Sequence, residues 1–220
     1  MGSPFDLEWI GDHLGDIIGK LIEHVELTAI AVVIGFLIAF PLGVLAFRHR
    51  RLYPPITWFT GVLYTIPSLA AFVLLIPFLG IGITNIEVAL VSYTLLILIR
   101  NVVAGLDGVS EDAKDAARGM GLTRRQILWR VEIPLALPVI VAGIRIAIVT
   151  TIGLITVSAL LGYGGLGFYI LQGFQQYFAT PIILGAVLSA LLAIAADGAM
   201  LLAERWLTPW RRAGRKQAEA

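Results

Sequence analysis

Residues 107–134 read DGVSEDAKDAARGMGLTRRQILWRVEIP, an extended polar stretch that lies between two long apolar runs. We call it the polar insert. Ser110 and the two acids that follow it predict a helix start, because a hydroxyl and acidic side chains satisfy free amides and the positive end of the helix dipole. Gly119 and Gly121 predict the end of that helix.

A second short helix is expected directly after the glycines. Thr123 and Gln126 have the spacing of a capping box, in which each side chain bonds the backbone of the other residue. Pro134 predicts the end of this helix, since a residue before proline avoids the helical region. The polar insert is therefore predicted to be a helix, a glycine turn and a second helix, and to be where the chain meets a partner in water.

The composition indicates a membrane protein. Hydrophobic residues make up 58% of the chain and charged residues 14%, with a mean hydropathy of +0.89, whereas soluble domains carry roughly 25% charged residues. The absence of cysteine from the sequence excludes disulfides, thiolate metal sites and cysteine nucleophiles. The net charge is +1, and no nucleic-acid partner is expected.

Five stretches are long and apolar enough to span a bilayer, which takes about 20 residues. They cover about 27–47, 56–79, 86–106, 138–161 and 182–203. Thr84 and Glu87 have capping-box spacing and are expected to open the third. The predicted fold class is an all-α polytopic membrane protein, a single domain over residues 1–220 with five transmembrane helices and a cytoplasmic helix-turn-helix loop.

Basic residues predict the orientation, because cytoplasmic loops are enriched in Lys and Arg. They occur after the first span, in the polar insert and in the tail at 204–220: Arg48, Arg50, Arg51, Lys114, Arg118, Arg124, Arg125, Arg130, Arg205, Arg211, Arg212, Arg215 and Lys216. The alternate loops, about 80–85 and 162–181, carry no charged residue. The N-terminus is therefore expected outside and the C-terminus inside.

Residues 1–26 are expected to form an outer lead-in. Six acids against Lys20 alone do not fit a cleavable secretory signal. Residues 5–22 form a candidate helix, interpreted either as an amphipathic helix on the outer membrane surface or as a lead-in packed on the first span.

The polar insert resembles the EAA-loop found in permease subunits of bacterial ATP-driven importers. That loop reads Glu-Ala-Ala, three residues, Gly, nine residues, then Ile-x-Leu-Pro. Here Asp115-Ala116-Ala117, Gly121 and Val131-Glu132-Ile133-Pro134 fall at the same spacing. Asp115 is shorter than Glu, so a partner contact through its carboxylate needs adjusted geometry.

Other stretches resemble permeases for the quaternary-amine osmoprotectants glycine betaine, choline and carnitine. They are YTIPSL at 64–69, GIG at 80–82, GYGGLG at 162–167, AD at 196–197 and ERWLTP at 204–209. The resemblance runs from about residue 22 to 209. Related permeases share the core and the loop, so methionine stays an alternative substrate.

The resemblance implies a bacterial cell-membrane complex of two permease subunits, identical or paralogous, two ATPase subunits and an external substrate-binding protein. It implies that the chain is no enzyme and holds no cofactor, since the ATPase binds ATP and magnesium. The family's EAA-loop helix docks in a groove on the ATPase. The alternative is a solvated loop whose charges only follow the positive-inside rule.

The residues expected at the ATPase contact have different expected roles. Charged side chains are expected to form ion pairs at the rim: Asp112, Asp115, Arg118, Arg124 and Arg125. Ala116, Ala117 and Met120 are expected to supply the packed contact, Gly121 to allow close backbone approach, and Pro134 to close the motif.

Three ionisable residues within the spans, Arg100, Arg145 and Asp197, are costly in lipid and face protein, water or a partner. An ion pair of Asp197 with Arg145 or Arg100 is the favoured interpretation. A direct contact of Asp197 with a cationic substrate is the alternative.

Proline and aromatic residues suggest a translocation path. Pro67, next to Ser68, is expected to kink the second span, because proline removes an intrahelical hydrogen bond. Tyr64 and Tyr93 are candidate contacts for a quaternary ammonium group through cation–π attraction, with packing as the alternative.

Several other motifs and functions are not supported. GxGxxG at 162–167 follows an apolar span and is interpreted as a tight turn, since a dinucleotide site needs a strand before it. Gly15 to Lys20 lacks the spacing of a phosphate loop, and the three histidines have no metal-ligand spacing. A channel or carrier without an ATPase stays a less favoured alternative, and an intramembrane enzyme lacks paired acids or a nucleophile.

Overall fold

The computed structural model describes residues 6–209 as helices joined by short connections, with no strand in that range. Most of the chain lies in α1 (Leu7–Asp12), α2 (Leu14–Arg48), α3 (Tyr53–Thr65), α4 (Ser68–Leu79), α5 (Ile83–Asp107), α6 (Glu111–Gly119), α7 (Arg124–Ile127), α8 (Ile133–Ser158), α9 (Gly167–Gln176) and α10 (Ala179–Leu207). Short 3-10 turns occupy Arg50–Leu52 and Ala159–Leu161. The all-α prediction is confirmed. The tail residues Arg211, Arg212, Arg215 and Lys216, like residues 1–5, lie outside the described range.

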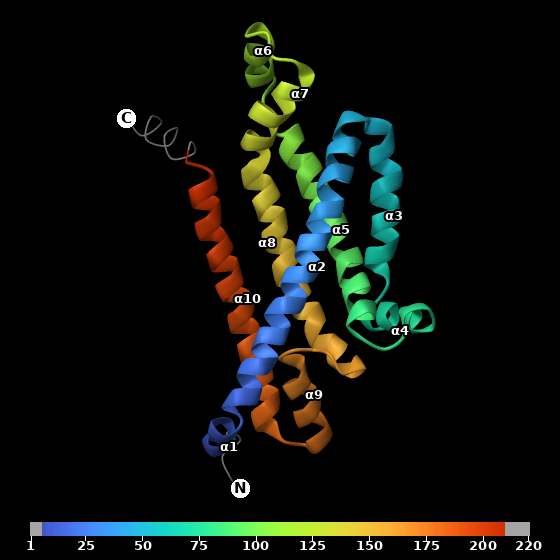
Figure 1. Ribbon diagram of the computed structural model, residues 1–220, viewed down its shortest axis with the longest axis vertical. Helices are drawn as coiled ribbons and strands as arrows, with labels where there is room; N and C mark the ends of the chain where they lie inside the picture. The colour runs from blue at the N-terminus through green and yellow to red at the C-terminus, as the bar shows by residue number, and fades with distance from the viewer. Residues whose placement is uncertain (1–5, 210–220) are drawn as a thin grey trace.

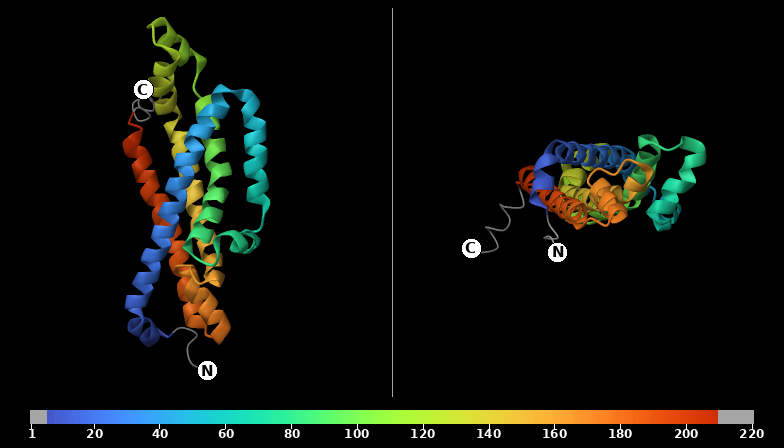
Figure 2. Two further views of the ribbon diagram at one scale, coloured as in Figure 1. Left: turned by 45° about the vertical axis from the view of Figure 1, so that its right-hand side comes forward. Right: turned by 90° about the horizontal axis from the view of Figure 1, so that it is seen from below.

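The helices form an elongated bundle. Within residues 6–209, four helical segments are long and apolar enough to cross a membrane, and a bent pair raises the number to five if it counts as one span. The polar insert, with α6 and α7, forms one end of the bundle, and α1 and α9 lie at the other (Figure 1). Seen from below, α3 and α4 lie on the side away from α10 (Figure 2).

The second predicted span is broken, not merely kinked. The helical segments on either side of Ile66 and Pro67 meet at 98°. Ile66 is extended (φ −65°, ψ 127°), as expected for a residue before proline. The Tyr93 hydroxyl donates to the Ile66 carbonyl, so a backbone group freed by the break is satisfied inside the protein.

The first span begins earlier than expected. α2 runs unbroken from Leu14 to Arg48, so most of the candidate helix at 5–22 is the start of the span itself. A separate helix is limited to α1, where the Asp6 side chain accepts from the Trp9 amide at 3.0 Å. This arrangement fits a lead-in to the span better than a long independent surface helix.

Small residues let α2 lie close to α5. Ala31, Gly35, Ala39 and Gly43 recur every four residues on α2, and all four are buried. A Cβ added at Gly43 would lie 2.6 Å from Cγ1 of Val102 on α5. Small residues at this spacing are typical of helix pairs in membranes, where close backbone approach provides the packing energy.

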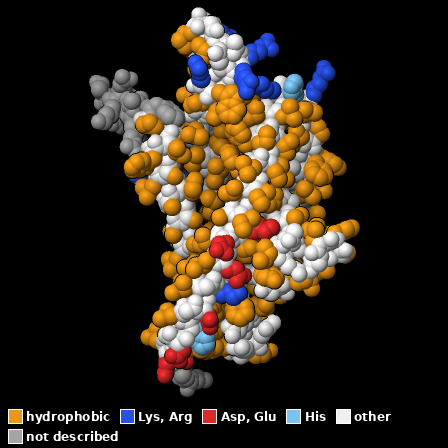
Figure 3. Space-filling model, in the orientation of Figure 1, with side chains coloured by type: hydrophobic (Ala, Val, Ile, Leu, Met, Phe, Trp, Pro, Cys, Tyr) orange, Lys and Arg blue, Asp and Glu red, His pale blue; other side chains and the backbone are white. Residues whose placement is uncertain are grey.

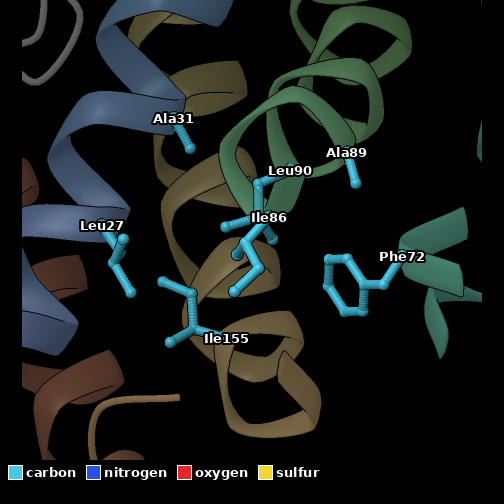
Figure 4. Close-up of a cluster of buried hydrophobic side chains, with 7 residues drawn as sticks. All are labelled: Leu27, Ala31, Phe72, Ile86, Ala89, Leu90 and Ile155. Carbon is cyan, nitrogen blue, oxygen red and sulfur yellow. The ribbon is translucent and has the colours of Figure 1, made fainter. Parts of the chain in front are cut away.

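The interior is apolar where these helices meet. One cluster joins α2, α4, α5 and α8 through Leu27, Ala31, Phe72, Ile86, Ala89, Leu90 and Ile155, as Figure 4 shows. Hydrophobic side chains also cover the visible sides of the bundle, while Lys and Arg gather at the end that carries the polar insert (Figure 3). An apolar flank with a basic end is the pattern expected of a helical membrane protein.

Candidate functional site

The first helix of the polar insert has both of its ends capped as predicted. The Ser110 hydroxyl accepts from the Ala113 amide at 3.4 Å and begins α6. At its end, Gly121 has φ +80°, and its amide bonds the Arg118 carbonyl while the Leu122 amide bonds that of Ala117. This pair of bonds is a Schellman motif, which needs a left-handed residue and favours glycine.

The second helix does not stop at Pro134. The capping box of Thr123 and Gln126 is present and begins α7, but the chain then continues through a π-helical turn, Leu128–Glu132, into α8. In this turn the Ile133 amide bonds the Leu128 carbonyl, five residues back. A wider turn suits proline, because it relieves the clash between its ring and the preceding carbonyls. The expected helix end at Pro134 is therefore wrong, and α7 is continuous with a membrane span.

Two contacts attach the polar insert to the end of α2. Arg50 donates to Asp107 through both terminal nitrogens, one of them at 2.8 Å. Lys114 is buried, with its Nζ 2.9 Å from Glu111 and 5.8 Å from the ring centroid of Phe47. The insert is thereby held against α2 on one side and is continuous with α8 on the other.

Most residues expected to contact a partner ATPase are exposed on this insert. They are Asp112, Asp115, Ala116, Arg118, Met120, Gly121, Arg124 and Arg125. Asp115 and Arg118 already pair with each other. Ala117 differs from expectation, because its side chain is 1% exposed and packs inside the chain, and Pro134 is half-buried. Of the three residues expected to pack against the ATPase, Ala116 and Met120 therefore remain available for that contact.

A basic cleft of about 550 Å³ lies between the polar insert and the end of α2. Its lining is Phe47, Arg48, His49, Arg118, Arg124, Ile127 and Glu132. Because three arginines and one glutamate line the cleft, it should attract anionic groups.

The intramembrane ion pair forms between α8 and α10. Arg145 donates to Asp197 from Nε at 2.8 Å and from Nη2 at 2.9 Å. Glu204 lies 3.8 Å from the same guanidinium. Arg100 lies exposed on α5 and is not a member of this pair. A cleft of about 500 Å³ opens beside Arg145 and Asp197, so both stay accessible.

The expected path residues meet at the break between α3 and α4. The rings of Tyr64 and Tyr93 lie edge to face, with centroids 5.9 Å apart. Tyr64 is exposed, whereas Tyr93 is buried. Pro67 caps the start of α4 and Ser68 is its first residue. The structure thus brings four of the five predicted path residues together and leaves Asp197 in a separate cleft.

Sequence reasoning missed Glu87 as a buried acid. Gly82 precedes the first residue of α5, so Thr84 lies inside the helix and the expected capping box with Glu87 is not formed. Glu87 is 8% exposed, and neither carboxylate oxygen has a hydrogen-bond partner among the described residues. An acid within an apolar stretch of spanning length was the signal that could have identified it.

Comparisons with known proteins point to membrane transport. Residues 31–209 match the family described as binding-protein-dependent transport system inner membrane component. The choline transport system permease protein OpuBB of Bacillus subtilis is 40% identical over 195 residues, which cover 89% of this chain and 90% of that protein. The osmoprotectant import permease protein OsmW of Salmonella typhimurium is 38% identical, with 92% and 97% covered.

Solved structures agree with this match. A structure of the MetNI methionine ABC transporter in inward-facing conformations superposes with a TM-score of 0.80 at 27% identity, covering 94% of this chain and all of that chain.

Proposed function

The chain belongs to the family of binding-protein-dependent transport system inner membrane components, and from this membership we propose that it is the permease subunit of an ATP-driven importer for quaternary-amine osmoprotectants. Two relatives, both above 35% identity over most of the chain, are named for choline and for osmoprotectants. A third, from Bacillus subtilis, is named for glycine betaine, carnitine and choline and is 38% identical. The methionine transporter is more distant, at 27% identity.

One structural observation carries the mechanical part of the proposal: the polar insert is continuous with α8 and anchored to α2. α6 is joined to α7 by the glycine turn at 119–121 and is held to α2 through Lys114 at the ring of Phe47, so a force applied to α6 can reach both α2 and α8. ATP binding would close two partner ATPase subunits, move α6, and reorient the spans toward the outside to accept substrate. In this scheme the ATPase binds ATP and magnesium, and this chain supplies the path by which the substrate crosses the membrane.

The proposed complex holds a second permease subunit, identical or paralogous, and an external binding protein that selects the substrate. The polar insert faces the cytoplasm and α9 faces the outside. The basic end of the bundle supports this orientation, because Lys and Arg are enriched on the cytoplasmic side.

Uptake by the reconstituted complex tests the function. Proteoliposomes that contain this chain with its ATPase and binding protein are supplied with labelled choline, glycine betaine or methionine. We expect ATP-dependent uptake of the two quaternary amines. Uptake of methionine alone supports the alternative importer, and choline uptake without any ATPase supports a carrier.

Cysteine labelling tests the orientation, because the chain has no native cysteine. Met120 and Tyr177 are 72% and 98% exposed and lie on opposite ends of the bundle. An impermeant maleimide added to intact cells should label Tyr177→Cys and leave Met120→Cys unlabelled. The reverse pattern overturns the cytoplasmic placement of the polar insert.

A further inference from the structure

The glycine loop, residues 162–166, is fastened to α2 by two neighbouring side chains. The Leu166 amide donates to Nδ1 of His24 at 3.2 Å, and the Gly165 amide donates to Oε1 of Glu23 at 3.2 Å. On its other ring nitrogen, Nε2, His24 bonds the Ile152 carbonyl of α8 at 3.1 Å. A single imidazole therefore joins α2, α8 and the loop that leads into α9.

The fit between the loop and α2 is close. His24 is fully buried. Gly165 has φ +49°, and a Cβ added there would lie 2.8 Å from Cα of His24. Only a residue without a side chain allows this approach, so the glycine pattern at 162–167 serves a contact with α2 that lies far away in the sequence.

These partners fix the protonation state of His24. A backbone amide can only donate, so Nδ1 carries no proton, and a carbonyl can only accept, so Nε2 carries one. The ring is therefore the neutral Nε2–H tautomer. Protonation would place N–H groups face to face at Nδ1 and Leu166, and the bond between them would be lost.

We propose that His24 and Glu23 form a latch that positions the glycine loop and α9 for the external binding protein, and that acid on that side releases the latch. His24 acts as a positioning residue, because it is fully buried and acts through the loop that it holds. This role rests on the proposed function, which places α9 outside. The unlatching itself does not depend on that function.

Other ionisable groups surround the latch. They are Lys20, Glu23 and Glu26 of α2, Tyr163 of the loop, Tyr169 of α9, and Glu87 near the start of α5. α8 adds none between Ile146 and Ser158. Acidification can protonate more than one of these groups, because burial also makes a carboxylate easier to protonate. A comparison in which His24 alone is replaced keeps all the other groups constant.

His24→Gln is that comparison, because glutamine offers a donor and an acceptor but does not titrate. Amide hydrogen exchange of residues 163–168 is measured in the complete complex for wild type and variant, from about pH 7.5 to about pH 4.5. The range extends well below the ordinary histidine value because burial disfavours the charged imidazole. Dividing the wild-type exchange rate by the variant rate at each pH removes the chemical effect of pH on exchange. We expect this ratio to rise on acidification by about threefold to tenfold, as for loss of one hydrogen bond. A ratio independent of pH overturns the latch.

Uptake then tests its role in transport. With only the outer pH lowered, wild-type uptake should fall more steeply than that of His24→Gln, while His13→Gln, a histidine near the same end, should follow wild type. A pH-dependent exchange ratio with identical uptake profiles overturns the positioning role but leaves the proposed function intact. If His24→Gln assembles poorly, His24→Asn provides the same non-titrating comparison.

Discussion

Arg145 on α8 and Asp197 on α10 are joined by two parallel hydrogen bonds of 2.8 and 2.9 Å. The two charges lie in segments that are long and apolar enough to cross the membrane. Neither charge is stable alone at that depth, because an unpaired ionised side chain in lipid is costly. The pair therefore holds the last two spans together.

Replacing either member should reduce the amount of intact complex. Asp197→Asn leaves the guanidinium without its carboxylate, and Arg145→Lys keeps the charge but loses the two-point geometry. We expect roughly a fivefold or greater loss for Asp197→Asn and a smaller loss for Arg145→Lys. Combining Arg145→Asp with Asp197→Arg should give partial recovery, because Glu204 lies beside position 145 and would repel the new carboxylate. The measurement is the yield of complex after extraction and gel filtration. Arg100→Gln is the control, and an equal loss there would contradict the assignment.

Gly121 should be needed for coupling rather than for assembly. Its φ of +80° costs about 1–2 kcal/mol for a residue with a side chain, while a Cβ at this position meets nothing within 4 Å. Gly121→Leu should therefore distort the turn after α6 and lower uptake per ATP hydrolysed, with the protein still in the membrane. Gly119→Leu adds the same bulk at an equally open position without a left-handed angle. Equal coupling in the two variants would rule out a backbone role for Gly121.

Gly43 should be sensitive to a single methyl group. Gly43→Ala places a Cβ 2.6 and 2.8 Å from Cγ1 and Cβ of Val102, and overpacking of this kind costs about 1–3 kcal/mol. We expect a lower thermal midpoint of the purified complex, and only partial recovery when Val102→Ala is added, because alanine removes Cγ1 but keeps Cβ. Gly61→Ala, at an open helical position, should leave the midpoint unchanged or raise it. A neutral Gly43→Ala would contradict the close α2–α5 packing.

Local chemistry made much of the fold predictable. The caps at Ser110 and Thr123 and the turn at Gly121 depend on neighbouring residues only. The spans followed from length and hydrophobicity. The full break at Pro67 was not predictable from local sequence, because the Tyr93 hydroxyl that satisfies the Ile66 carbonyl there lies 27 residues further along the chain.

Long-range contacts also explain why the roles of several functional residues could not be predicted from the sequence. Sequence reasoning found no metal-ligand spacing for the histidines and gave His24 no other role, since its partners Ile152 and Leu166 are 128 and 142 residues away. Pro134 was expected to end a helix, and the π-helical turn before it removed that requirement. Sequence reasoning left two candidate ion-pair partners for Asp197, Arg100 and Arg145. The structure shows that the partner is Arg145.

The aromatic pair at the broken span should contribute to passage of a quaternary ammonium group. Tyr64 is exposed, and its ring lies 5.9 Å from that of Tyr93. Cation–π attraction of about 0.5–2 kcal/mol predicts that Tyr64→Leu slows choline uptake by about threefold to thirtyfold. Tyr64→Phe keeps the aromatic face and should stay near wild type. ATP hydrolysis stimulated by the binding protein serves as the second readout, because it should persist in Tyr64→Leu if only the path is affected. Unchanged uptake in Tyr64→Leu would show that the ring only packs.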